Sequence, residues 1–193
     1  MTVPAWTEVQ LAIGGALRLA RGDRRGLGFF DASIDGFWRS FRAALICYPP
    51  YLLHLRFRID APVWEAAGVV PILATETIAY VISWVAFPLL ILPLARQLGR
   101  ENRFLGFMVA YNWSQIPQAV LFVLIGLDGV TGLFPPSVVQ VAGLLAVIAV
   151  LVYQWFIARV ALAVNAAQAM VVVIIDVVMG TALGHIAEQL YAP

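Results

Sequence analysis

The chain has 193 residues, of which 62% are hydrophobic and 12% charged, with a formal net charge of +1. Soluble domains average about 45–50% apolar and about 25% charged residues, so this composition excludes an ordinary soluble protein and predicts an all-α polytopic membrane helical bundle. The small net charge excludes a general attraction to nucleic acid, and the single cysteine excludes an internal disulfide.

The first 35 residues are predicted to form an N-terminal cytoplasmic segment with an amphipathic helix over residues 4–21. Its apolar positions recur at helical spacing: Val9, Ile13, Leu17 and Ala20. Such a helix lies either on the membrane surface or against the protein's own bundle, and the pattern leaves both alternatives open. The following stretch GDRRGLG, at residues 22–28, is typical of a linker.

Residues 36–193 are predicted to form a five-span transmembrane domain, because each span needs about 20 mostly apolar residues. The spans are expected at about 36–55, 66–94, 104–127, 138–161 and 167–190. The first is the least typical, since Arg39 and Arg42 open it and Pro49-Pro50 interrupt it. The second is longer than a span requires, so it tilts, kinks or begins as an interfacial turn.

The arginines predict the orientation of these spans. With the N-terminus in the cytoplasm, the inner segments hold Arg18, Arg21, Arg24, Arg25, Arg39, Arg42, Arg96, Arg100, Arg103 and Arg159. The outer segments hold only Arg56 and Arg58, so the positive-inside rule predicts a cytoplasmic N-terminus and an outside C-terminus. All twelve basic residues are arginine, which hints at a GC-rich bacterial gene and hence at the bacterial inner membrane.

The sequence contains no recognisable catalytic or metal-binding pattern. His54 and His185 are isolated, and there is no cysteine pair, no phosphate-binding loop and no visible nucleophile–base pair. We therefore expect no enzyme activity, no metal and no cofactor. The polar residues inside the spans carry the functional information.

Asp176 is the least ordinary of these residues. It lies about ten residues into the fifth span, or about 15 Å deep, close to the midplane of a ~30 Å hydrocarbon core. An aspartate there costs about 2.5–3.5 kcal/mol on insertion scales, so it faces protein or water. Gly180 and Gly184 follow on the same helical face and form a GxxxG sequence, which permits another helix to approach closely.

The third span carries the polar stretch YNWSQIPQ at residues 111–118. Asn112 and Gln115 lie at about the depth of Asp176 and share one helical stripe, so we expect Asp176 to meet one of these two amides. The polar cluster predicted around this acid consists of Asp176, Asn112, Gln115, Ser114 and Glu76.

Pro117 is predicted to open the third span. It lacks a backbone N–H and clashes with the carbonyl of Trp113, so that carbonyl needs another partner. Ser114 or Gln118 is the expected side chain to assist there. The stretch then forms a kinked, polar and inward-facing part of the helix.

Glu76 is the second buried acid, and its depth depends on where the second span begins. Near the midplane it would face Asp176 and suggest a proton or cation path. Near the outer surface it would be solvated or paired with Arg56 or Arg58. The structural role is the favoured one of the two.

Two stretches carry a resemblance to a known family. In the third span, a Y-G-Y-S-L-I-P type motif is matched in register by Tyr111, Trp113, Ser114, Ile116 and Pro117. In the first span, Gly36, Phe37 and Trp38 match the end of a D-L-Y-G-P-F-W motif without its proline. With the five spans, these motifs resemble the Yip family of membrane proteins, which are associated with Rab GTPases and vesicle traffic. The resemblance implies a membrane scaffold without a catalytic site.

Two functional hypotheses follow. The first is a non-enzymatic Yip-like scaffold, or an assembly or trafficking factor, for other membrane proteins. The alternative is a small carrier or permease that uses Asp176, alone or with Glu76, for proton or cation coupling. The expected partners are the lipid bilayer and either other membrane proteins or a second copy of the chain, but not nucleic acid.

Overall fold

The computed structural model describes residues 5–191 and shows an all-α protein, with no strand in that range. The elements are α1 (Ala5–Ala20), the 3-10 helix η1 (Arg24–Phe29), α2 (Ile34–Ser40), α3 (Arg42–Arg58), α4 (Ala61–Ala67), α5 (Val69–Gln97), the 3-10 helix η2 (Glu101–Arg103), α6 (Phe104–Thr131), α7 (Pro136–Ala161) and α8 (Ala166–Tyr191). The predicted all-α class is confirmed. Four of the described helices, α5 to α8, are long and apolar enough to cross a membrane, as expected of a multi-pass membrane protein.

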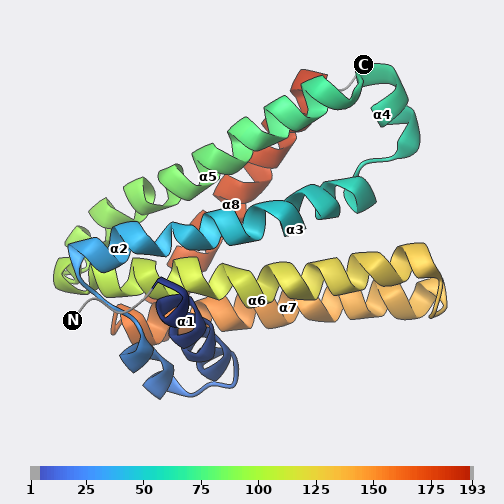
Figure 1. Ribbon diagram of the computed structural model, residues 1–193. Helices are drawn as coiled ribbons and strands as arrows, with labels where there is room; N and C mark the ends of the chain where they lie inside the picture. Colours follow the sequence, from blue (N-terminus) through green and yellow to red (C-terminus); the bar gives the residue numbers. More distant parts are fainter. Residues whose placement is uncertain (1–4, 192–193) are drawn as a thin grey trace.

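The third, fourth and fifth predicted spans coincide with α6, α7 and α8 to within four residues at each end. The first predicted span is divided, because Phe41 interrupts the helix between α2 and the 17-residue α3. Pro49 and Pro50 lie inside α3 without ending it. Figure 1 shows α2 and α3 following one another alongside α6.

The second predicted span begins three residues later than expected. Gly68 has a φ of +81°, a conformation that L-residues rarely adopt, and it separates the short helix α4 from α5. The first residues of the apolar stretch therefore belong to α4. The 29-residue α5 follows and continues through Pro88 and Pro93.

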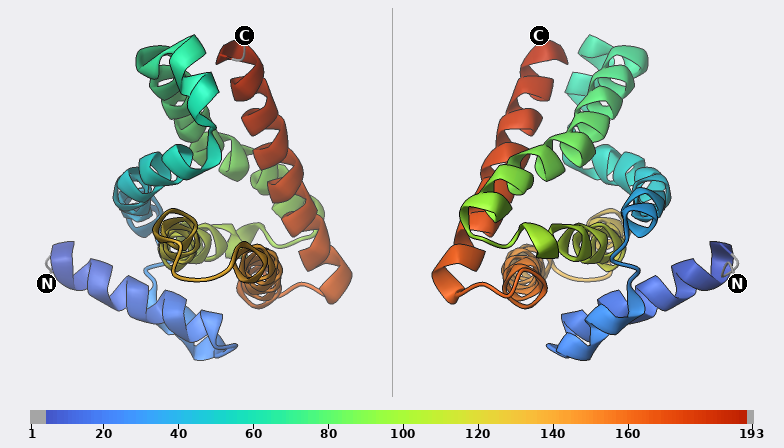
Figure 2. Two further views of the ribbon diagram at one scale, coloured as in Figure 1. Left: turned by 90° about the vertical axis from the view of Figure 1, so that its right-hand side faces the viewer. Right: turned by 90° about the vertical axis from the view of Figure 1, so that its left-hand side faces the viewer.

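The long helices form a bundle in which α5 packs on α8, α6 packs on α7, and α3 packs on α6 (Figures 1 and 2). One end of the bundle holds α2, η2 and the connection between α7 and α8. The opposite end holds α4, the turn between α6 and α7, and the end of α8 (Figure 1). These two ends are called the N-terminal end and the α4 end below.

Helix α1 docks on the bundle, against α6 and α7. Its buried face is formed by Val9, Ala12, Ala16 and Leu19. The hydroxyl of Tyr153 on α7 donates a hydrogen bond to the carbonyl of Ala16 over 2.7 Å. Leu17 and Ala20 belong to the predicted apolar stripe, but both are exposed. The face of α1 that packs on the bundle is therefore rotated about the helix axis relative to the predicted face.

The stretch predicted as a linker is folded instead. Residues 24–29 form η1, capped by the side chain of Asp23, and η1 packs tightly against α1. A Cβ atom placed on Gly26 would lie 2.5 Å from the carbonyl oxygen of Gly15. The two glycines therefore permit a backbone contact that larger residues would prevent.

Candidate intramembrane site

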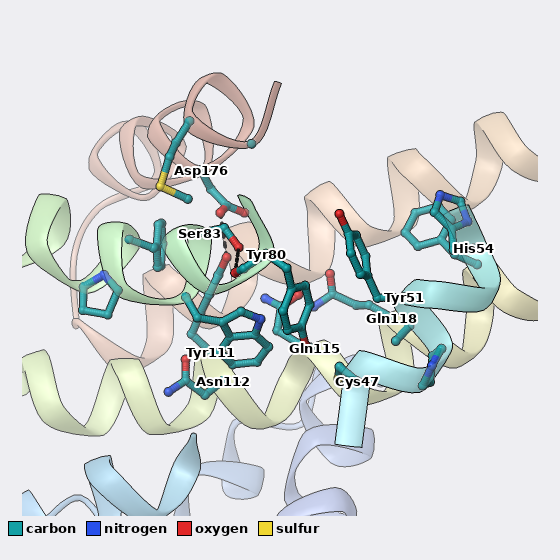
Figure 3. Close-up of a pocket in the computed structure, with 18 residues that line it drawn as sticks. Cys47, Tyr51, His54, Tyr80, Ser83, Tyr111, Asn112, Gln115, Gln118 and Asp176 are labelled. Atoms are coloured by element: carbon teal, nitrogen blue, oxygen red, sulfur yellow. Dashed lines mark hydrogen bonds between the residues drawn. The ribbon is translucent and has the colours of Figure 1, made fainter. Parts of the chain in front are cut away.

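A half-open cavity of about 360 Å³ lies between α3, α5, α6 and α8 (Figure 3). Its lining residues are Cys47, Pro50, Tyr51 and His54 from α3; Tyr80, Ser83, Trp84, Phe87 and Pro88 from α5; Tyr111, Asn112, Gln115, Gln118, Ala119 and Phe122 from α6; and Asp176, Met179 and Gly180 from α8. Most of this lining is aromatic or aliphatic, and four of its polar side chains come from the stretch YNWSQIPQ: Tyr111, Asn112, Gln115 and Gln118. Clefts and cavities between the helices of a bundle are typical sites for small ligands.

Asp176 faces this cavity from α8, as Figure 3 shows. Its Oδ1 accepts a hydrogen bond from the hydroxyl of Tyr111 over 2.6 Å. The expectation that Asp176 faces protein agrees with this contact, but the partner is neither of the amides expected. Asn112 and Gln115 line the same cavity without a hydrogen bond to the carboxyl group.

The amide of Asn112 is used in a contact between helices. Its Nδ2 donates to the hydroxyl of Ser40 at the end of α2 over 2.8 Å, and both residues are buried. In turn, the Ser40 hydroxyl donates to the carbonyl of Phe37 over 2.6 Å. The polar residue at position 112 therefore joins α2 to α6.

The polar residues beside Pro117 bond within α6 and to α7. Ser114 donates to the carbonyl of Tyr111 over 2.7 Å, and Gln118 Nε2 donates to the carbonyl of Ser114 over 2.9 Å. Gln154 on α7 donates to Gln118 Oε1 over 3.2 Å. The side chain of Gln118 thus supports the helix next to the proline. It bonds the carbonyl of Ser114, however, and not the carbonyl of Trp113, which was expected to need a partner. The helix α6 continues through Pro117.

Two buried polar atoms at the cavity have no hydrogen-bond partner among the described residues: Gln115 Nε2 and His54 Nδ1. Buried polar atoms are nearly always hydrogen-bonded in folded proteins, because an unsatisfied one costs about 1–3 kcal/mol. The bonds within the chain therefore do not satisfy this cavity completely. An occupant with polar atoms would complete them.

Aromatic rings line the wall of the cavity in two groups. The ring centroids of Tyr51 and Tyr80 are 4.7 Å apart, and those of Tyr80 and Trp84 are 6.0 Å apart. On the side of Asp176, the rings of Phe87 and Tyr111 stack with a centroid distance of 4.1 Å. This wall gives the cavity an apolar, electron-rich surface.

Glu76 belongs to a different site, near the α4 end of the bundle. It is 1% exposed and forms an ion pair with Arg58, while Tyr51 and Tyr191 donate hydrogen bonds to its carboxylate. Tyr191 lies fifteen residues after Asp176 on α8, or about 22 Å along the helix. The two acids therefore do not face one another, and Glu76 has the pairing with arginine that a position near the outer surface predicts.

The two glycines of the GxxxG sequence are not buried by another helix of the described chain. A Cβ atom on Gly180 would meet nothing within 4 Å, and one on Gly184 would meet only Nη1 of Arg58, at 3.8 Å. Gly180 lies at the exposed edge of the cavity. The close helix approach expected at these glycines is therefore absent within residues 5–191.

The two stretches that resemble the Yip motifs lie against one another. Phe37 and Trp113 belong to one apolar cluster, which Ile116 also joins, and the bond from Asn112 to Ser40 connects the same two helices. Trp38 is 66% exposed, so its ring does not contribute to this cluster. Of the motif residues, Phe37, Trp113 and Ile116 thus serve the contact between α2 and α6, whereas Tyr111 bonds Asp176.

Residues 5–191 contain no group of three or more histidine, cysteine, aspartate or glutamate side chains that could hold a metal ion. Arg58 and Gln118 take the roles considered for them beside Glu76 and Pro117, whereas the prediction omitted the other residues of the two sites: Tyr51, His54, Tyr80, Gln154 and Tyr191. The sequence did contain a signal for the first site, because Tyr111, Gln115, Gln118 and Phe122 repeat at helical spacing.

Comparison of the chain with protein-family models, with curated proteins and with solved structures gave no match. The class that the fold defines is an all-α protein with four helices long and apolar enough to cross a membrane and a half-open cavity lined by polar and aromatic side chains. Its function has to be inferred from the chemistry of these residues.

Proposed function

We propose that the protein is a non-enzymatic, Yip-like integral membrane protein that acts as a scaffold, or as an assembly or trafficking factor, for other membrane proteins. In this proposal the chain crosses the bacterial inner membrane five times, by α2–α3 and then by α5 to α8. The N-terminus lies in the cytoplasm and the C-terminus outside. Its partners are lipids and either other membrane proteins or a second copy of the chain.

The arrangement of the helices supports this topology. The 17 residues of α3 extend about 26 Å, and together with α2 they run beside α6, which has spanning length (Figure 1). The ten arginines of the predicted inner segments lie toward the N-terminal end of the bundle, whereas Arg56 and Arg58 lie at the α4 end. This asymmetry follows the positive-inside rule.

The position of α1 supports an amphipathic helix at the cytoplasmic membrane surface. One face of α1 packs on the bundle, while Trp6, Leu11 and Leu17 remain 70%, 44% and 40% exposed. Apolar side chains beside arginines are typical of helices that lie in the headgroup region. In this proposal α1 therefore contacts both the bundle and the inner leaflet.

The observation that carries the scaffold proposal is the open GxxxG face of α8. Small residues let two membrane helices approach closely, and no helix of the described chain uses Gly180 in this way. Asn112, Ser114 and Glu76 also have their hydrogen bonds within the chain, as expected of residues that stabilise a bundle. A partner's transmembrane helix is the occupant that fits this face.

Gly180→Leu is expected to reduce co-purification of a membrane partner about tenfold, because the added side chain keeps the partner helix away from the backbone. The measurement is affinity purification from native membranes in mild detergent, with quantitative mass spectrometry. Gly143→Leu on α7 is the matched control, since Gly143 also has nothing within 4 Å of its Cβ position. Equal losses in both variants, or in neither, would contradict the role of the α8 face.

The cavity at Asp176 favours a second candidate, a small carrier or permease. A carboxyl group inside a membrane bundle, beside a cavity between the helices, is an arrangement used to couple a proton or cation to transport. In this candidate Asp176 acts without Glu76, because Glu76 is bound to Arg58 near the α4 end.

For the carrier, Asp176→Asn is expected to reduce ion flux to the level of empty vesicles, because an amide keeps the shape but cannot exchange a proton or balance a cation. The assay is flux into liposomes that contain the purified protein and a pH-sensitive dye. Glu65→Gln, which removes an exposed acid on α4, is the control and should retain wild-type flux. Absence of flux in the wild type would remove the carrier and leave the scaffold.

A further inference from the structure

The cavity contains a carboxyl group without a cationic partner. Asp176 has one hydrogen bond, from Tyr111, and no arginine is among the described residues that line the cavity. On the neighbouring helix α3, Arg58 is bound instead to Glu76 and Glu188. In a low-dielectric interior a carboxylate is strongly stabilised by an opposite charge within a few ångströms. The electrostatics of this cavity therefore favour a ligand with a positive charge.

The remaining wall suits a cation that carries apolar groups. The rings of Tyr51, Tyr80 and Trp84 form one connected surface on the side of α3 and α5. Cations are attracted to the faces of aromatic rings, with indole giving the strongest interaction. Alkyl groups around the charge would at the same time fill the apolar part of the cavity.

The size and ligand set of the cavity exclude a bare metal ion as the best occupant. A volume of about 360 Å³ falls within the range of about 300–1,000 Å³ found for small-molecule sites. Residues 5–191 offer no set of three side chains that could hold a metal ion. An organic ion fits both observations, and the unpartnered atoms Gln115 Nε2 and His54 Nδ1 leave room for a polar group on it.

We propose that this cavity binds a compact organic cation, of the quaternary ammonium class, with the carboxylate of Asp176 as its counter-ion and Trp84 as the principal aromatic contact. This inference deepens the carrier candidate and rests on it for a role in the membrane. Binding to the purified protein tests the inference alone, whereas flux in liposomes tests the carrier. Loss of flux with retained binding would thus overturn only the carrier.

The probe is radiolabelled benzyltrimethylammonium, whose charge does not change with pH. Binding to the full chain in lipid nanodiscs is measured by displacement, with empty nanodiscs as the blank. The unlabelled cation is expected to displace the probe at a concentration at least about tenfold lower than neopentylbenzene, its neutral isostere. This comparison uses only the wild-type protein, so it does not depend on the folding of any variant.

Two pairs of variants locate the site. Asp176→Asn is expected to weaken cation binding at least about tenfold, and Glu65→Gln, with the same change of charge, to leave it unchanged. Trp84→Leu is expected to weaken binding about fivefold, and Trp6→Leu, at an exposed position outside the cavity, to leave it unchanged. Saturable binding that is lost in this pattern supports the proposal.

Three results would overturn it. The first is that the wild type does not bind the cation above the blank. The second is that the neutral isostere competes as well as the cation, which would identify an apolar cavity only. The third is that Asp176→Asn binds as tightly as the wild type while its melting temperature shows that it is folded.

Discussion

Arg58→Met is expected to lower the free energy of unfolding by about 3 kcal/mol, because it leaves Glu76 as a buried carboxylate without its cation. The side chain of Glu76 is 2% exposed, so water cannot replace the guanidinium group. Tyr51 and Tyr191 still donate hydrogen bonds, but they carry no charge. For a chain of this length the loss corresponds to about 6–12 °C in Tm. The measurement is thermal unfolding of the purified protein in mild detergent.

The double variant Arg58→Met/Glu76→Gln is expected to recover most of this stability, since a neutral amide has no charge to compensate. Arg56→Met is the matched control, because Arg56 is exposed and lies two residues earlier on α3. It should change Tm by less than about 2 °C. If the double variant is no more stable than Arg58→Met, the loss comes from the packing of the arginine stem and not from the stranded charge.

The long helices were the predictable part of this fold. Mostly apolar runs of about 25 residues allow few structures other than membrane helices, so α6, α7 and α8 match their predicted spans closely. The α5 boundary was less predictable, because the residues around Gly68 form one continuous apolar pattern. The positive φ of this single glycine sets where α5 begins, and hydropathy contains no information about it.

The rotation of a helix about its axis was the least predictable property. Neighbouring residues on a helix point about 100° apart, so the rotation of α6 about its axis decides whether Tyr111 or Asn112 meets Asp176. The rotation depends on how α2 packs, because Asn112 is held by Ser40. The same limit applies to α1, where the small residue Ala16 faces the bundle and the larger Leu17 does not. Small residues allow close packing that a search for bulky apolar side chains misses.

A compact set of hydrogen bonds holds the chain at the start of α2. Asp31 accepts from the backbone N–H of Ser33 over 3.0 Å, and the hydroxyl of Ser33 accepts from the N–H of Gly36 over 3.0 Å. The hydrogen bonds from Ser33 hold the pKa of Asp31 below its usual value. Arg39 pairs with both Asp31 and Glu8, and this contact connects α2 to α1. Correct placement of this turn therefore positions α1 as well.

Gly36→Ala is expected to destabilise the protein by about 3 kcal/mol, although alanine is intrinsically the better helix former. An added Cβ would lie 1.9 Å from the carbonyl oxygen of Asp31, a backbone atom that cannot move away without breaking the turn. Thermal unfolding in detergent should show the loss, and limited proteolysis should cut the N-terminal segment faster than in the wild type.

Gly14→Ala provides the matched control in the same part of the molecule. Gly14 lies inside α1, and its Cβ position has nothing within 4 Å, so only helix propensity acts there. This variant is expected to gain about 0.5–1 kcal/mol and to retain wild-type resistance to protease. If the contact with Asp31 is what requires glycine at position 36, the two glycine-to-alanine changes shift the free energy of unfolding in opposite directions. A loss of equal size in both variants would contradict that requirement, and so would a gain in both.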